Sequence, residues 1–463
     1  MKKIGLVWFK NDLRLHDNEA LVTAVKECTE LLCCFCLEET HYQKHELGFR
    51  KADVNRFIFL EQTINNLKKN LKLIGGQLII GSKSALITLP ELINKYGITD
   101  IYAEQEYARY ELDLIDKLKD ALPNVNFNFF WVKTLYHIDD IPFSIAKIPL
   151  TSKAYRIPTA KASEPRKTLD VPKKINAIKK IKATKFPSYK EFGFKLKEYK
   201  NAAPFVKGGE DAALERLEYY TFKSEQLTKY RWSRNQSDGM DYSSKCSPYL
   251  ALGSISPREI YEKVKTYESK VKKNQSTWWL IFELVWRDYF TFKAMRFEDA
   301  IFKTKGYKNK TYQWENDPTK FEKWCNGKTG IPFIDAHMRQ LNQTGFMSNR
   351  GRVNCASYLV HDLKIDWTWG AAYFESKLID YDVSSNWMNW HMQAFEIWYT
   401  NPVNQSNKYK AQDFIRHWIP ELAKANNMEV LIPWENKFKG YPKPIEIYSK
   451  WDRAINLIKK IKV

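Results

Sequence analysis

The stretch between residues 346 and 391 combines bulky indoles with charged side chains at defined positions. It reads FMSNRGRVNCASYLVHDLKIDWTWGAAYFESKLIDYDVSSNWMNWH, and its charged pairs are Arg350 with Arg352 and Asp380 with Asp382. An ordinary core is built mainly from aliphatic residues and contains few ionisable groups. The mixture therefore favours a buried aromatic cofactor that exchanges electrons, with phosphate groups close by.

The polar end of this stretch is LIDYDVSSNW, which contains Asp380, Asp382 and Asn386. Carboxylates there can accept hydrogen bonds from a ring N–H or from ribose hydroxyls, and an amide can bond a ring nitrogen without bringing a charge. Metal binding is the competing interpretation, but the sequence has no cluster of His or Cys to support it.

The sequence Asn349-Arg350-Gly351-Arg352 places two cations close together. On a helix, Asn349 and Arg352 share a face while Arg350 points elsewhere. One Arg can then bind a cofactor while the other binds DNA. The alternative is an exposed basic turn without a ligand.

Residues 241–253, DYSSKCSPYLALG, have the composition of an anion-binding loop. Hydroxyls, a Lys and free backbone N–H groups before a helix start suit a phosphate or a pyrophosphate. The alternative is an N-capped loop with no ligand, since Ser-Pro helix starts are common.

Glu283 and Arg287 lie four residues apart in FELVWRDYF. Such a pair usually stabilises an exposed helix face. Here the neighbours are aromatic, so the face is expected to be largely buried. A carboxyl in that setting would have a raised pKa and could donate a hydrogen bond to a substrate carbonyl, and Arg287 could reach a phosphate.

The composition favours a nucleic-acid partner and a reducing compartment. The chain has 463 residues, enough for two or more domains, and a formal net charge of +20. Lys and Arg that neutralise phosphates release counterions, so nucleic acid is the leading partner and a generally basic surface is the alternative. The seven Cys lack metal-ligand spacing, and no secretory signal precedes them. No run approaches the ~20 apolar residues that a membrane helix needs. Together these observations predict a location in the cytoplasm.

The first third of the chain alternates strand and helix signals. Short apolar runs are separated by helical segments such as 54–72, and the runs lie at 4–9, 31–37, 76–81, 100–105 and 126–132. This alternation predicts a Rossmann-like α/β domain with a parallel sheet at 1–135. The fingerprint GxGxxG is absent after the first run, so this topology does not imply NAD.

The composition changes after residue 135. Residues 136–205 are rich in Lys and Pro, which predicts a linker that lies over the surface. From residue 206 helical periodicity dominates, as in 276–297, and SPRE at 256–259 is typical of a capping box with Pro at the first helical position. We therefore expect an all-helical domain over 206–463.

These motifs together resemble the photolyase/cryptochrome family over nearly the whole chain. VWFKNDLRLHDNEAL is similar to the family's first strand and loop, and SKCSPYLALGSISPREI, ELVWRDYF and LIDYDVSSNWMNW are similar to its flavin domain. Within the family, WRDYF, MSNRGRVN and LIDYDVSSNW look most like the DASH-type cryptochromes, which the family treats as photolyases that favour single-stranded DNA.

The resemblance implies a non-covalently bound FAD in the helical domain. One set of residues would hold the phosphates, and these are Tyr230, Ser243, Ser244, Lys245, Cys246 and Ser247. A second set would hold the flavin and the ribose, with Asn386 facing the flavin N5, and these are Arg352, Asp380, Asp382 and Asn386.

The resemblance also implies an enzyme, a deoxyribodipyrimidine photo-lyase of DASH type. In that family light drives an electron from reduced flavin to a cyclobutane pyrimidine dimer, which splits and returns the electron. Glu283 and Asn349 would stabilise the charge on the dimer, and the flipped dimer would stack on Trp286. Contacts to the DNA backbone are implied for Arg234, Arg287, Arg350 and Gln405.

Three Trp match the family's electron-transfer chain, with Trp390 next to the flavin, then Trp367, then Trp314 toward the surface. Any single Trp is explained as well by core packing, but three at the family's spacing favour the chain. Trp369 and Trp387 are expected to be packing residues.

The sequence departs from the family pattern at three places. Val353 stands where cyclobutane photolyases usually carry Met, and Met392 stands where they usually carry a second pocket Trp. Such a wall should stack a flipped base less strongly, which fits a preference for single strands or a loss of repair. The segment 148–161, IPLTSKAYRIPTAK, does not match the DASH pattern for a folate antenna. The default antenna is 5,10-methenyltetrahydrofolate, and no antenna is the alternative.

The leading hypothesis is an enzyme that repairs UV-damaged, single-stranded DNA as a monomer in the cytoplasm. The retained Glu283 and Asn386 favour it. The alternative is a blue-light photoreceptor that signals through the flavin redox state. A (6-4) photolyase is less well supported, because its pair of His is missing near Asn349, and a DNA-binding flavoprotein without chemistry is a further possibility.

Overall fold

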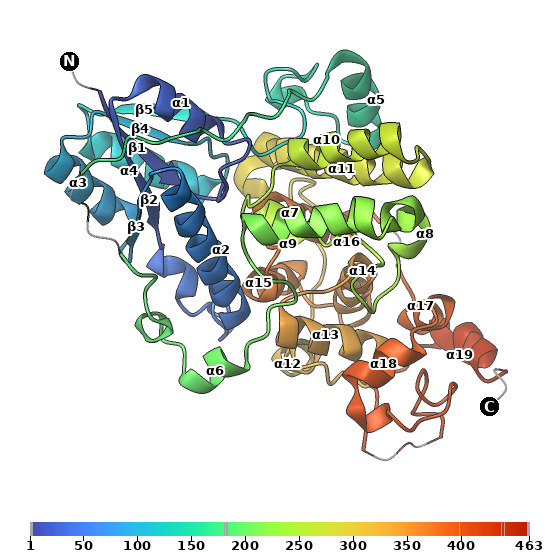
Figure 1. Cartoon of the computed structure of the whole chain (residues 1–463). Coiled ribbons are helices and arrows are strands. Elements are labelled where there is room, and N and C mark those ends of the chain that lie inside the picture. The colour runs from blue at the N-terminus through green and yellow to red at the C-terminus, as the bar shows by residue number, and fades with distance from the viewer. Residues whose placement is uncertain are drawn as a thin grey trace.

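The computed structural model describes residues 3–179, 181, 184–397, 399–436, 438 and 440–460. Its N-terminal unit contains a five-stranded parallel sheet of order β3-β2-β1-β4-β5 (Figure 1). The strands are β1 (Ile4–Phe9), β2 (Glu30–Cys36), β3 (Leu78–Gly81), β4 (Asp100–Glu104) and β5 (Asn126–Phe130). Each strand coincides with one of the five apolar runs, so the predicted Rossmann-like fold is confirmed.

Alternate residues of the strands enter two separate cores. Val7 and Phe9 pack on one face of the sheet with helices α1 and α2, and Leu6 and Trp8 pack on the other face with α3 and α4. Because both faces are covered, the inner strand β1 is apolar along its whole length, whereas the edge strand β5 is only partly buried and contains Asn126 and Asn128. The four helices are α1 (Glu19–Glu27), α2 (Val54–Leu73), α3 (Ala85–Tyr96) and α4 (Arg109–Ala121).

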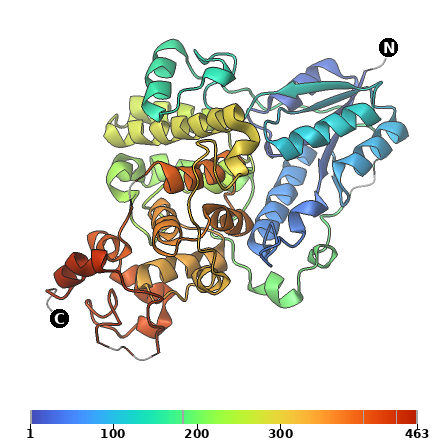
Figure 2. The ribbon, with the colours of Figure 1, turned by 180° about the vertical axis from the view of Figure 1, so that it is seen from behind.

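Residues 136–205 run between the two units and pack against both (Figures 1 and 2). Helix α5 (Ser152–Ala162) lies against α11 (Gln275–Phe297), and its Tyr155 is fully buried in the helical core. Ile175 and Phe192 join the core on the α1–α2 face of the sheet, and α6 (Leu196–Asn201) follows. The segment is therefore anchored at several points, although the domain boundaries 1–135, 136–205 and 206–463 stay a prediction.

The rest of the described chain is helical, which confirms the second part of the predicted fold. Its further helices are α7 (Glu210–Glu218), α8 (Tyr230–Ser233), α9 (Ser247–Ala251), α10 (Pro257–Lys270), α12 (Pro318–Cys325), α13 (Pro332–Thr344), α14 (Asn349–Ser357), α15 (Trp367–Lys377), α16 (Val383–Phe395), α17 (Pro402–Lys408), α18 (Gln412–Trp418) and α19 (Asp452–Ile458). At the start of α10, Ser256 Oγ accepts the Glu259 N–H at 3.0 Å, which is the forward bond of the predicted capping box.

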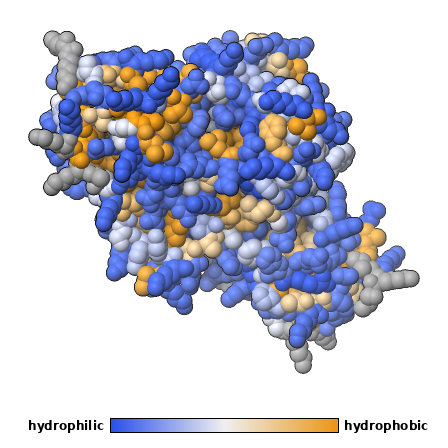
Figure 3. Space-filling view, viewed as in Figure 1, coloured by the Kyte–Doolittle hydropathy of each residue, from blue (hydrophilic) through white to orange (hydrophobic). Residues whose placement is uncertain are grey.

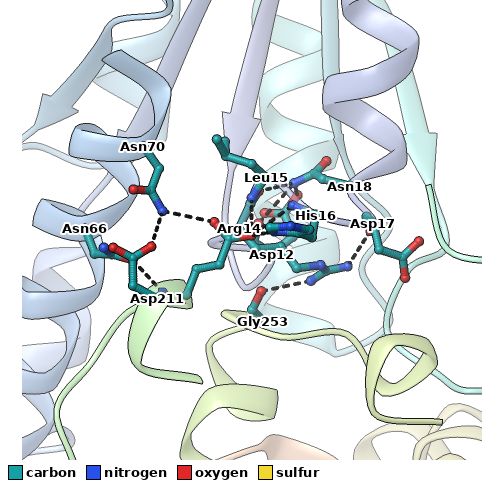
Figure 4. Close-up of polar contacts among 11 residues, drawn as sticks. Asp12, Arg14, Leu15, His16, Asp17, Asn18, Asn66, Asn70, Asp211 and Gly253 are labelled. Carbon is teal, nitrogen blue, oxygen red and sulfur yellow. Dashed lines mark hydrogen bonds and ion pairs between the residues drawn. The ribbon is translucent and has the colours of Figure 1, made fainter. Parts of the chain in front are cut away.

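The loop after β1 is joined to the helical unit by a buried carboxylate (Figure 4). Glu210, at the start of α7, accepts hydrogen bonds from the backbone N–H groups of Leu15 and His16 at 3.0 and 2.9 Å. The His16 ring lies 2.7 Å from the same oxygen, and Asn70 of α2 donates to the other oxygen at 3.3 Å. The first turn of α7 is thereby fixed both to the loop after β1 and to α2, which covers one face of the sheet.

Two further contacts complete this interface. The Arg14 guanidinium donates to the Gly253 carbonyl at 2.9 Å, and Arg258 forms two hydrogen bonds with the buried Asp17 carboxylate at 2.9 and 2.6 Å. Gly253 has a φ of +65°, and a Cβ there would lie 1.9 Å from the Asn11 carbonyl oxygen. Only Gly allows this approach of the two backbones.

The surface and the thiols agree with the composition. Hydrophilic residues cover most of the face in Figure 3. Within the described ranges, no helix is long and apolar enough to cross a membrane, and no group of three or more His, Cys, Asp or Glu is placed to hold a metal ion. All seven Cys are free thiols, and Cys33 and Cys34 are buried on opposite faces of the sheet as small apolar side chains.

Candidate functional site

The loop before α9 is held by Arg216 of α7. Its guanidinium donates to the carbonyl oxygens of Met240, Ser243 and Ser244 at 2.8, 3.1 and 3.0 Å. Since three carbonyls face one cation, the loop has a defined conformation. No sequence pattern indicates this role of Arg216, because the residue lies outside the DYSSKCSP motif and meets the loop only through the tertiary fold.

Lys245 is a buried cation in this loop. Its side chain is 2% exposed, its Nζ donates to Ser243 Oγ at 3.1 Å, and its ammonium lies over the Tyr242 ring. Burial lowers the pKa of Lys245 to about 6, and Arg216 adds to the decrease. Among the described residues no carboxylate forms an ion pair with Lys245. An anion in this loop would therefore supply the missing charge partner.

The helix that follows the loop contributes little to this anion site. Helix α9 has only five residues, Ser247–Ala251, so its dipole is small. Cys246 is buried in the helical core, and its N–H bonds Ser244 Oγ at 3.4 Å. The site expected from a helix N-terminus thus depends on Lys245 and on the hydroxyls instead.

Residues from distant parts of the sequence meet at Asp380. Ser247 Oγ and the Arg352 guanidinium both donate to Asp380 Oδ2, at 2.7 and 2.6 Å. The second carboxylate oxygen, Oδ1, is buried and has no hydrogen-bond partner in the described structure. Because buried acceptors are normally satisfied, Oδ1 is available to a ligand N–H or hydroxyl.

Asp382 and Asn386 lie at the start of α16. Asp382 accepts the Ser385 N–H and the Ser384 hydroxyl, each at 2.8 Å. Burial acts to raise the pKa of Asp382, but Arg287 and these hydrogen bonds hold it below its usual range. Asn386 is buried, and its Nδ2 donates to the Ala371 carbonyl at 3.0 Å, which sets the orientation of the amide.

Glu283 lies in a second group of side chains, on the half-buried face of α11. Its Oε1 accepts hydrogen bonds from the Trp279 indole at 2.9 Å and from Arg234 at 3.1 Å. Burial raises the pKa of Glu283, although Arg234 and the indole N–H oppose the rise. The pKa of this carboxyl is therefore raised, as expected. The cation paired with it is Arg234, which the sequence did not indicate as its partner.

Glu283 and Arg287 do not form the ion pair that their spacing of four residues would allow. Arg287 donates to the Lys133 carbonyl of the sheet unit and lies 4.0 Å from Asp382. Spacing of four residues makes two side chains neighbours, but partners on other elements decide which contact forms. Arg287, one of the predicted DNA-contact residues, therefore lies at the interface between the units.

The remaining predicted lesion and DNA residues are spread over three helices. Arg350 donates to Asn235 at 2.8 Å and stacks on Tyr409, whereas Arg352 points to Asp380, so the two Arg do separate as predicted. Asn349 is exposed at the first position of α14. Gln405 is half-buried on α17, and its Oε1 has no hydrogen-bond partner in the described part of the chain.

The aromatic residues near Glu283 differ in exposure. Trp286 is half-buried and contacts Phe290 with ring centroids 5.4 Å apart. Tyr230 is buried behind this face and packs edge-on against Tyr220. Val353 and Met392, the two departures from the family pattern, are both half-buried.

The three Trp of the predicted electron chain are ordered by exposure. Trp390 and Trp367 are buried and Trp314 is half-buried. A Cβ at Gly370 would lie 2.2 Å from the Trp390 ring, so that indole packs on the helical turn after Trp367. A series of ring contacts connects Trp367 to Trp314. The Trp367 and Phe395 ring centroids are 6.1 Å apart. The Tyr312 ring lies 5.4 Å from Phe395 and 5.4 Å from Trp314.

Two further indoles contact this chain. Trp324 is fully buried and packs edge-on against Trp390 at 6.2 Å, and Trp387 packs edge-on against Trp367 at 5.8 Å. Trp324 was not singled out from the sequence, because nothing in its local pattern separates it from a core residue.

A cavity of about 680 Å³ lies between the two units, at the carboxyl ends of β1, β2 and β4. Lys133 forms ion pairs with Glu104 at 2.7 Å and Glu106 at 3.2 Å, and Lys10 lies 3.1 Å from Glu106. The position and the volume of this cavity are typical of ligand pockets in parallel α/β folds. These four residues come from three segments that lie far apart in the chain, so no sequence pattern indicates their cluster.

Comparisons with known proteins identify the family. The family described as DNA photolyase matches residues 5–173, and the FAD binding domain of DNA photolyase matches residues 279–459. Cryptochrome DASH from Synechocystis sp. is 39% identical over 439 residues, which cover 93% of this chain and 90% of that protein. Cryptochrome DASH from Xenopus laevis is 37% identical over 480 residues, covering 98% and 92%.

Solved structures give the same result. The cryptochrome of Synechocystis sp. superposes with a TM-score of 0.91 at 36% identity, covering 100% of both chains. A bacterial class III photolyase from Agrobacterium tumefaciens superposes with a TM-score of 0.83 at 26% identity, covering 99% of this chain and 98% of that one. The chain therefore belongs to the photolyase/cryptochrome family and carries its FAD-binding domain.

Proposed function

We propose that this protein repairs cyclobutane pyrimidine dimers in DNA, preferably in single strands, by a light-driven electron from reduced FAD. The observation that carries the proposal is the cluster of Glu283, Arg234 and Trp279. It combines a carboxyl of raised pKa with a cation able to bind a phosphate. The family includes proteins named photolyase and proteins named cryptochrome, and this cluster favours the enzyme.

The described residues fit FAD. Lys245 is a buried amine of lowered pKa without a carboxylate partner, and the cofactor's diphosphate would favour its protonated form. Asp380 Oδ1 is a buried acceptor without a donor, and a ring N–H or a ribose hydroxyl would supply one. When bound and reduced, FAD supplies the electron that light transfers to the dimer.

Glu283 would act by a hydrogen bond to the dimer carbonyl, where negative charge develops. It can donate this bond only when protonated, and Arg234 opposes protonation in the free protein. A DNA phosphate would attract Arg234 away from Glu283. Burial would then raise the pKa of the carboxyl without opposition from this cation, so that DNA binding itself prepares the proton donor.

The preference for single strands is supported by the walls of the site. Trp286 offers one indole face, whereas Val353 and Met392 offer aliphatic surface to a flipped base. Extrusion from a duplex costs unstacking and unpairing energy, and weaker stacking on these walls compensates less of that cost. A single strand is largely free of the pairing cost.

The antenna, the oligomeric state and the cellular compartment stay predictions. The cavity between the units is large enough to enclose an aromatic antenna chromophore, with 5,10-methenyltetrahydrofolate as the default. We infer a monomer in the cytoplasm, for which the high net charge and the seven free thiols give support.

Replacing Glu283 tests the proposed donor. Glu283→Ala should slow repair of a dimer-containing single strand by about 10- to 100-fold, by analogy with the loss of other preorganised donors. Glu283→Gln keeps an N–H donor and should retain most of the rate. Repair is measured as restored thymines under equal illumination. Glu322→Ala, which removes an exposed carboxylate on α12, is the control. Equal rates in Glu283→Ala and wild type would rule out this role, and loss of FAD absorbance would mean that Glu283 supports the cofactor.

Lys245 should make FAD binding depend on pH. In the apoprotein its pKa is about 6, and a bound diphosphate raises it, so binding takes up a proton above pH 6. FAD affinity should therefore fall with rising pH between 6 and 8, by up to about tenfold per pH unit. Titration of the apoprotein by quenching of FAD fluorescence measures this slope. Lys245→Met should bind FAD more weakly at pH 6 with a flat profile, and an unchanged slope in the variant would refute the assignment.

Trp390→Phe should block photoreduction of oxidised FAD while repair by the chemically reduced protein continues. Phe is much harder to oxidise than Trp, so the first step from the buried indole is lost. The rate of flavin bleaching under blue light with an external reductant should fall at least about tenfold, which corresponds to 1.4 kcal/mol in the barrier. Trp369→Phe is the matched control and should be close to wild type. Normal bleaching in Trp390→Phe would mean that electrons enter by another route.

A further inference from the structure

An exposed aromatic surface lies next to Glu283. Trp232 at the end of α8 is 73% exposed, and Trp278 in the first turn of α11 is 50% exposed. Burial of an indole is strongly favourable, so two large exposed Trp, connected through Arg231 and Trp279, mark a binding surface rather than a core. We call it the Trp232–Trp278 surface, and it consists of Arg231, Trp232, Trp278, Trp279 and Phe282.

This surface is assembled before any ligand binds. The Arg231 guanidinium lies between two indoles, 4.8 Å from the Trp232 ring and 5.3 Å from the Trp279 ring. Trp278 contacts Trp279 and Phe282 with ring centroids 5.6 and 4.9 Å apart. The Arg231 N–H also bonds Ser276 Oγ at 3.1 Å, which ties α8 to the first turn of α11.

The surface is continuous with the lesion site. Trp279 donates to Glu283 at 2.9 Å, and Arg234 lies over the Trp279 ring at 4.6 Å. Phe282 contacts Trp286, with ring centroids 6.2 Å apart. A strand whose damaged bases reach Trp286 would therefore pass its neighbouring bases over Trp278 and Trp232.

We infer that the Trp232–Trp278 surface binds single-stranded nucleic acid by stacking the unpaired bases next to the lesion. Its place beside the lesion rests on the proposed function, but the binding itself does not need damage or light. Every base presents an aromatic face, so indoles hold any sequence, and Arg231 can neutralise the phosphates between stacked bases. The bases of a duplex are already stacked on each other and cannot use this surface.

The charge of the molecule argues against another occupant. A second copy of this chain would bring Arg231 and Arg234 against the same residues, in molecules that each carry a formal net charge of +20. Like charges at a self-complementary interface repel, whereas a polyanion is attracted. Single-stranded nucleic acid satisfies both the aromatic and the cationic side chains.

The experiment measures the dissociation constant of the FAD-loaded protein in the dark. The probe is a fluorescent, undamaged thymidine oligonucleotide of about 15 nucleotides, close to the upper end of single-strand site sizes. Trp232→Ala/Trp278→Ala should raise the dissociation constant for the single strand about tenfold or more, and that for the matched duplex less than about twofold. Trp232→Phe/Trp278→Phe keeps two rings and should restore most of the affinity. Leu73→Ala removes an equally exposed apolar side chain at the end of α2 and is the control.

Three outcomes would overturn the inference. These are an unchanged single-strand affinity in the Ala variant, an equal loss for duplex and single strand, or a wild-type dimer in gel filtration that the Ala variant abolishes. The last would assign the surface to a second copy. Because the probe is undamaged and kept in the dark, a failure of photorepair leaves the inference standing. If the wild-type protein performs photorepair but the Ala variant binds the single strand with unchanged affinity, the inference fails and the proposed function stands.

Discussion

The buried polar contacts between the loop after β1 and the helical unit determine where the proposed cofactor residues lie. Glu210 is held by the backbone of that loop and begins α7, and Arg216 on the same helix holds the carbonyls of the Lys245 loop. Arg14 meets the backbone at Gly253, two residues after α9 ends. Buried carboxylates are costly unless each oxygen is hydrogen-bonded, so this interface tolerates few alternative arrangements.

The two halves of the site share one electrostatic design. At the Lys245 loop a buried amine lacks an anionic partner, and at Glu283 a half-buried carboxyl whose pKa is raised by burial is paired with Arg234, which opposes that rise. Each ligand changes the local charge in the direction that its own binding needs. A diphosphate would restore the charge of Lys245, and a DNA phosphate that attracts Arg234 would favour the protonated form of Glu283. Cofactor and substrate thus complete an arrangement that the protein alone leaves unfinished.

The parts of the molecule that could be predicted from sequence are those with local signals. Continuous apolar runs located all five strands, and the motifs around Ser247, Arg352 and Asp380 identified three side chains that meet in space. The partners of Glu283 and Arg287 could not be predicted, because helical spacing does not reveal Arg234 or the Lys133 carbonyl as competing partners.

Other features had no local signal at all. The sequence around Trp324 indicates an ordinary core residue, and only tertiary packing places its ring against Trp390. Residues 136–205 were expected to lie over the surface because Lys and Pro dominate their composition. That composition gives no sign that Tyr155 is buried and anchors α5 in the helical core. The Trp232–Trp278 surface joins two segments about 45 residues apart, so its continuity depends on how α8 packs on α11.

Light-driven repair of DNA is the proposed function on which the roles of Glu283 and Lys245 depend. The most direct measurement illuminates the reduced, FAD-loaded protein with an oligonucleotide that carries one cyclobutane thymine dimer, as a single strand and as a matched duplex, and quantifies the remaining dimer beside a dark sample. The account predicts loss of the dimer in the light only, and faster loss from the single strand. Persistence of the dimer in both illuminated samples would contradict it.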